Sequence, residues 1–164
     1  MRLRAIFILL ISFLSSGTFS QTREITGKII DKDFNPVFFA KIFNVDTTLL
    51  TNVDNNGNFK LEIPFETKSL IIGSVSMEWQ LINLKSNCDH LEIVLLANAT
   101  YDFISAGKVD RLRKKQFKKL PGYFQNAFEK GVFKNDKPCY DRIFIPKKQR
   151  LKEIKRNRAK MPST

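Results

Sequence analysis

The sequence predicts an all-β fold, a small antiparallel β-sandwich of about seven strands, followed by a basic, partly helical C-terminal extension. Two observations lead to this prediction. Between Ile25 and Leu96, short apolar runs alternate with turn residues and show no helical period. After Tyr101 the apolar spacing becomes helical, and the chain becomes strongly basic.

Charge divides the chain into two parts. Residues 21–101 contain 7 Lys or Arg and 10 Asp or Glu, whereas residues 102–164 contain 19 and 6. The first part is therefore mildly acidic, and the excess positive charge lies in the second. A length of 164 residues leaves room for one domain and an appendage. We expect a signal peptide at 1–20, the sandwich at 21–101 and the extension at 102–164.

The N-terminus has the pattern of an export signal. Arg2 and Arg4 precede the apolar run 5–14, and mostly small residues follow as far as Ser20. The run is about half as long as the ~20 residues that span a membrane. We expect cleavage near Ser20/Gln21, the alternatives being an uncleaved anchor or a buried N-terminal strand. No cysteine directly follows the apolar run, so lipoprotein attachment has no acceptor.

Several segments of the mature chain have strand character, rich in β-branched and aromatic residues. They are 25–31, 37–45, 59–63, 69–76, 78–84 and 91–96. The strongest turn is Asp54–Asn58, because Asn and Gly tolerate the positive φ that tight hairpins need. Many short strands at close spacing favour a sandwich over other all-β folds.

The order of these elements resembles the carboxypeptidase regulatory-like domain. The resemblance rests on three motifs across residues 23–96: Ile25-Thr26-Gly27-Lys28-Ile29-Ile30-Asp31, Asn35-Pro36-Val37 and Asp54-Asn55-Asn56-Gly57-Asn58-Phe59. It implies a transthyretin-like sandwich, a common accessory module of exported bacterial proteins, including at the front of TonB-dependent receptors. Met77-Glu78-Trp79 departs from the small-residue and Tyr turn of many members. We interpret Trp79 as a packing residue of the core or surface.

Two helices are expected in the extension. Apolar residues in 107–120 follow helical spacing, although Arg113 falls inside their arc. Pro121 suits the first position of a second helix, and Gly131 suits its C-terminal cap. We expect both helices to pack on the sandwich or on a partner.

The final segment, Pro146–Thr164, contains a single acid. Its eight basic residues are Lys147, Lys148, Arg150, Lys152, Lys155, Arg156, Arg158 and Lys160. Such a run is typical of a solvated segment. The functional alternative is attachment to an anionic membrane surface or an acidic partner, at ~1 kcal/mol for each basic residue near acidic lipid.

Cys88 and Cys139 are the only cysteines. In an oxidising compartment they can form a disulfide that ties the sandwich to the extension. Such a bond would close a loop of about fifty residues and add ~4 kcal/mol on the chain-entropy model. The alternative is two separate thiols.

Candidate catalytic residues are few. His90 is the only histidine, which excludes a zinc site of several His ligands and leaves one base for a Ser-His-Asp arrangement. Cys88 and His90 would share a face of an extended strand, which keeps a small Cys/His enzyme as an alternative. No phosphate-binding loop is present. We predict no catalytic residue, metal ligand or cofactor.

These observations predict an exported, non-enzymatic binding or scaffolding module of the cell envelope, in the periplasm or at the outer membrane. Its expected partner is an envelope protein or glycan, with the basic tail on an anionic surface. The alternative is a nucleic-acid-binding protein, because the tail combines basic and aromatic residues. Export argues against that alternative.

Overall fold

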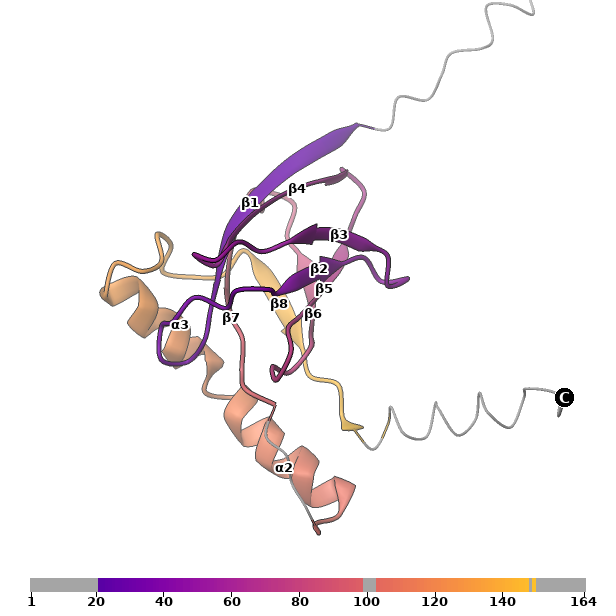
Figure 1. The fold of residues 1–164 in the computed structure, drawn as a ribbon, viewed down its shortest axis with the longest axis vertical. Helices are drawn as coiled ribbons and strands as arrows, with labels where there is room; N and C mark the ends of the chain where they lie inside the picture. Colours follow the sequence, from indigo (N-terminus) through magenta and orange to yellow (C-terminus); the bar gives the residue numbers. More distant parts are fainter. Residues whose placement is uncertain (1–20, 99–102, 148, 150–164) are drawn as a thin grey trace, which may run out of the picture.

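The computed structural model describes residues 21–98, 103–147 and 149. In these residues the chain forms two β-sheets, with two helices lying outside them (Figure 1). The predicted two-sheet, mostly β architecture is therefore confirmed. The predicted signal peptide, residues 1–20, lies outside the described residues.

The first sheet has three strands in the order β4-β1-β7. They are β4 (Asn58–Pro64), β1 (Thr22–Ile30) and β7 (His90–Val94). β1 is antiparallel to β4 but parallel to β7. The prediction of a purely antiparallel sandwich is wrong at this pair. The chain builds strands of the other sheet between β1 and β7, and such a long crossover permits a parallel pair.

The second sheet is antiparallel throughout, with five strands in the order β3-β2-β5-β6-β8. These are β3 (Leu49–Asn52), β2 (Lys41–Phe43), β5 (Ser69–Gly73), β6 (Gln80–Leu84) and β8 (Tyr140–Ile143). β3 and β8 were not predicted. β2 is shorter than the predicted strand 37–45, because Phe39 has a φ of 57° and interrupts the extended backbone.

The main hydrophobic core lies between the two sheets. Alternate residues of each strand point into it, as in β4, where Phe59, Leu61 and Ile63 are buried between exposed neighbours. Ile25 and Ile29 of β1 also belong to this core. The other sheet faces them with Ile42, Leu70, Ile72, Ile82 and Tyr140.

Both predicted helices are present. α2 (Ala106–Phe117) begins after Ser105, whose hydroxyl accepts a hydrogen bond from the backbone N–H of Lys108. α3 (Leu120–Glu129) has Pro121 in its first turn, and Gly131 follows its cap with a φ of 69°.

α3 covers a second apolar cluster. Its residues Leu120, Phe124 and Ala127 pack with Phe133 on Ile30, Val94 and Leu96 of the sandwich. Val109 is the buried residue of α2, so this helix is held more loosely by apolar contacts. The interpretation that the extension packs on the sandwich therefore holds for α3.

The extension also completes the sandwich itself. Its strand β8 pairs with β6, and Tyr140 is 1% exposed within the core. The Tyr140 hydroxyl donates to the backbone oxygen of Glu92 at 2.9 Å and accepts from Arg142 Nη2 at 2.8 Å. The charge of the chain thus changes near residue 101, but the hydrophobic core includes residues from both sides of that point.

Tyr140 makes a testable contribution to stability at high pH. Burial raises the pKa of Tyr140 above its ordinary value of 10.0, although nearby Arg142 opposes this. The folded state therefore keeps the phenol proton at pH values where the unfolded chain loses it, so the unfolding free energy should fall as pH rises above about 10. In Tyr140→Phe the decline should be shallower, and stability at neutral pH should drop by about 1–2 kcal/mol.

Urea titrations at a series of pH values from neutral to alkaline measure this effect. Tyr123→Phe, on α3, is the control for loss of a hydroxyl elsewhere. An equal alkaline decline in wild type and Tyr140→Phe would contradict the assignment.

Candidate ligand groove

Trp79 forms an aromatic platform on the outer face of the five-stranded sheet. Its ring stacks on Phe43 with 5.2 Å between centroids and 15° between planes, yet the residue remains 52% exposed. Gly73 makes room for it, since a Cβ at that position would lie 2.6 Å from ring atoms Cδ2 and Cε2. Trp79 is therefore a half-exposed surface residue whose ring packs on Phe43 and Gly73, and it is not a core residue.

Gln80 follows Trp79 in the chain, and its buried side chain has an unsatisfied polar atom. The residue is 6% exposed, and its side-chain Nε2 donates to the backbone oxygen of Val94 at 3.0 Å. Because the donor is engaged by a carbonyl, the amide oxygen Oε1 is oriented the other way, and it has no hydrogen-bond partner among the described residues. A buried acceptor without a partner is uncommon in proteins.

Arg113 joins α2 to the sandwich through an ion-pair network. Its Nε donates to Glu78 Oε1 at 2.7 Å, and its Nη1 contacts Asp110 Oδ1 at 3.1 Å. The same Nη1 donates to the backbone oxygen of Ile145 at 3.1 Å, and the guanidinium lies 5.2 Å from the centre of the Phe144 ring. Arg113 thus lies within the apolar arc of α2 because it is the residue that docks this helix.

The Trp79 platform, Gln80 and the ion pair of Arg113 with Glu78 line one groove of about 360 Å³. Strand residues Ile71 and Leu81 form its apolar floor, while Thr47, Asn98 and Lys147 add polar groups. Such a mixture of aromatic, apolar and a few fixed polar groups is the usual lining of a ligand site. Charge on the guanidinium is balanced by its two carboxylates, so the groove suits a ligand rich in hydroxyl and amide groups.

Lys147 is the one member of the predicted basic tail that the structure describes. Its backbone N–H donates to Asp110 Oδ1 at 2.7 Å, and the residue lines the rim of the groove. The chain therefore leaves the described part of the molecule beside the groove. Outside the described residues lie Lys148, Arg150, Lys152, Lys155, Arg156, Arg158 and Lys160.

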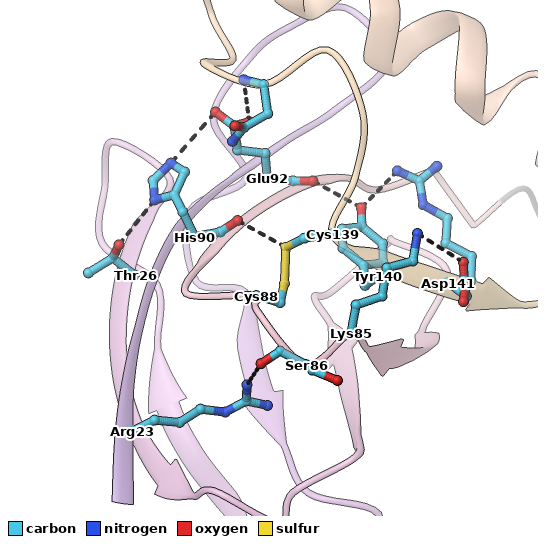
Figure 2. Close-up of a disulfide and its surroundings, with 12 residues drawn as sticks. Arg23, Thr26, Lys85, Ser86, Cys88, His90, Glu92, Cys139, Tyr140 and Asp141 are labelled. Atoms are coloured by element: carbon cyan, nitrogen blue, oxygen red, sulfur yellow. Dashed lines mark hydrogen bonds and ion pairs between the residues drawn. A yellow bond between two sulfur atoms is a disulfide. The ribbon is translucent and has the colours of Figure 1, made fainter.

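The structure joins Cys88 and Cys139 in a disulfide, with Cα atoms 5.2 Å apart (Figure 2). This distance lies in the normal range for such bonds. Cys88 is fully buried, at 0% exposed. With its sulfur bonded, Cys88 presents no thiol beside His90, which removes the basis of the Cys/His pair in this state.

His90 instead belongs to a polar row on the outer face of the three-stranded sheet (Figure 2). Its Nδ1 lies 3.0 Å from Thr26 Oγ1, and its Nε2 lies 3.6 Å from Glu92 Oε1. The buried Glu92 carboxylate accepts three hydrogen bonds, from the backbone N–H groups of Lys134 and Asn135 and from the Asn135 amide. Glu92 therefore anchors the loop that leads to β8.

The sequence analysis did not predict this polar row or the groove. Thr26, His90 and Glu92 come from two strands that become neighbours only through the parallel pairing. Glu78 and Arg113 are 35 positions apart in the chain. The one available hint was Met77-Glu78-Trp79, which departs from the turn expected in the family that the sequence resembles.

Within the described ranges, no cluster of three or more His, Cys, Asp or Glu is arranged to hold a metal ion. Nor does that part of the chain include a helix with the length and apolar character needed to cross a membrane. Comparison of the chain with known protein families and with curated proteins finds no match in either.

Proposed function

We propose that the chain is an exported binding module of the cell envelope that holds a glycan in the Trp79 groove. The observation that carries this proposal is the half-exposed indole of Trp79, held flat against Gly73 and Phe43 beside polar side chains. Sugar rings present C–H groups on a face and hydroxyls around the rim. An aromatic face bordered by planar polar groups matches that distribution.

The polar groups of the groove suit hydroxyl ligands. Glu78 and Asn98 both line the groove and bring a carboxylate and an amide to it. Arg113 holds the carboxylate in place through the 2.7 Å contact, so a ligand meets a preorganised site. These groups favour a saccharide over a purely apolar ligand.

Export is supported by the cysteine chemistry. A disulfide between the only two cysteines is expected in an oxidising compartment and is rare in the cytosol. The N-terminal pattern of Arg2, Arg4 and an apolar run agrees with that location. On this proposal the sandwich is of the transthyretin-like, carboxypeptidase regulatory-like type, supported by its two sheets and by the motifs around Gly27 and Gly57.

Trp79→Ala should reduce glycan affinity at least tenfold, as expected for loss of a central aromatic contact of about 1.4 kcal/mol or more. Gly73→Ala should do the same while keeping the indole, because its Cβ would displace the ring. A glycan array of neutral and acidic envelope saccharides identifies the probe, and calorimetry measures each variant.

The matched control is Phe65→Ala, which removes another exposed aromatic outside the groove. Because Trp79 is the only tryptophan, its fluorescence reports directly on occupation of the groove. The glycan proposal would be contradicted if no saccharide alters this fluorescence, or if Trp79→Ala binds the glycan as tightly as wild type. A short peptide that alters it would assign the groove to a protein partner.

The tail supplies a second, independent contact on this proposal. Truncation after Lys147 leaves the groove intact and removes seven basic residues of the predicted anionic-surface segment. We expect the truncated protein to be released from vesicles of anionic lipid at lower salt than the full chain, because screened charge contacts are lost. Identical salt profiles in vesicle sedimentation would refute the role of the tail.

A further inference from the structure

α2 contacts the rest of the molecule through one side. Val109 is its buried residue, and Arg113 forms the ion pair with Glu78 of the sandwich. Phe117 packs on the second apolar cluster and against the ring of Phe144. Val109, Arg113 and Phe117 are four positions apart, so they form one stripe along the helix. Because α2 lies outside the two sheets (Figure 1), the side opposite this stripe faces away from the sandwich.

Five exposed basic residues cover that opposite side, on α2 and on the two residues that follow it. At about 100° per residue they fall within an arc of about 100°, across the helix from the stripe. They form what we call the basic face: Lys108, Arg111, Lys115, Lys118 and Lys119. Within the described part of the chain, none of them forms an ion pair with a carboxylate. Asp110, the one acid of α2, is engaged by Arg113 and by the backbone N–H of Lys147.

The basic face destabilises the helix that carries it. The first turn of α2 contains no acid, and Lys108 places a positive charge near the helix N-terminus, where the helix dipole is already positive. Arg111 and Lys115 are like charges at a spacing of four, which repel each other along the helix surface. The fold itself therefore gains little from this charge, whereas an anionic partner would compensate it.

Exposed apolar side chains accompany the basic face. Leu112 is 37% exposed and, in the helical projection, lies between Val109 and the basic residues. Phe103, shortly before the helix, is fully exposed. Basic residues with exposed apolar neighbours are typical of helices on a membrane surface, where the apolar groups enter the headgroup region. A nucleic acid would neutralise the charges but would offer Leu112 no apolar environment, so the combination favours lipid.

We propose that α2 lies on a bilayer surface of anionic lipid, with its basic face against the lipid phosphates and Leu112 at the headgroup level. The proposal rests on the export and envelope location of the proposed function, and it adds a contact that does not involve the C-terminal tail. Arg113, on the docked side of α2, lines the Trp79 groove. The membrane contact and the groove therefore lie on different sides of one helix, so that binding to lipid leaves the groove open.

The test is sedimentation of the full mature chain with vesicles of phosphatidylglycerol and phosphatidylcholine. Arg111→Gln/Lys115→Gln/Lys118→Gln removes three charges from the basic face, and glutamine has nearly the same helix propensity as lysine and arginine. We expect this variant to bind the vesicles roughly a hundredfold more weakly at low salt, as the loss of three charge contacts at an anionic surface implies. Vesicles of phosphatidylcholine alone should bind neither protein.

Lys41→Gln/Lys68→Gln/Lys134→Gln is the matched control, because it removes the same net charge from exposed positions outside α2. It should bind within about threefold of wild type, since distant exposed charges are screened. Equal binding by the two triple variants would show that α2 is not the contact and would overturn the proposal. Both variants keep the basic tail, so that result would leave the separate prediction for the tail standing.

Leu112→Ala distinguishes lipid from other polyanions. It should weaken vesicle binding by about threefold, because one partly exposed apolar side chain no longer enters the headgroup region. Its elution from a heparin column should match that of wild type, because no charge is changed. Vesicle binding that does not respond to Leu112→Ala, or tighter binding to duplex DNA than to the vesicles at the same salt concentration, overturns the assignment to lipid.

Discussion

Replacing Cys88 and Cys139 together by alanine is expected to lower the unfolding free energy by about 4 kcal/mol. The two residues are 51 positions apart, and the chain-entropy model gives this value for a closed loop of that length. The bond also holds β8 against the sandwich beside the buried Tyr140. Guanidinium titrations of wild type and the double variant, followed by circular dichroism, measure the difference.

Reductant supplies the control for this experiment. Treating the wild type with a thiol reductant removes the cross-link without changing any side chain in the core. Reduced wild type should therefore approach the double variant, and the variant itself should not respond to reductant. If oxidised and reduced wild type unfold at the same denaturant concentration, the bond contributes nothing to stability.

Glu92→Ala is expected to cost about 3–4 kcal/mol, because it leaves buried donors without an acceptor. Three N–H groups of Lys134 and Asn135 converge on the Glu92 carboxylate, whose side chain is 2% exposed. Glu92→Gln should lose about half as much, since one of the two oxygens becomes a donor while the other still accepts.

Thermal and urea unfolding of the two variants measure these costs. Glu66→Ala, an exposed glutamate, should change stability by less than about 0.5 kcal/mol and provides the baseline for removing a surface carboxylate. A Glu92→Ala protein as stable as Glu66→Ala would show that the 134–135 loop is not held by this carboxylate.

The sandwich could be predicted because the residues that face its core can be recognised from the local sequence. β4 alternates buried Phe59, Leu61 and Ile63 with exposed residues, so each inward position can be recognised from its own neighbours. The turn at Gly57 and the helix start at Pro121 are likewise local, since backbone conformation at these residues depends on their own chemistry.

β8 could not be predicted in the same way. Its four residues include both a charged pair, Asp141 and Arg142, and the core residue Tyr140, so the segment lacks a clean alternation. It becomes a strand because β6 offers an unpaired edge and the disulfide holds Cys139 beside it. Tertiary context therefore outweighed local propensity at this segment.

The sequence alone was enough to predict the division into an acidic sandwich and a basic extension, most of the strands, both helices and the candidate cysteine pair. Only the tertiary structure decided the parallel pairing of β1 with β7, the grouping of Trp79 with Arg113 and the pairing of β8 with β6. The physical reason is that burial patterns repeat along neighbouring residues. Sites, in contrast, are formed by side chains whose proximity depends on the packing of distant segments.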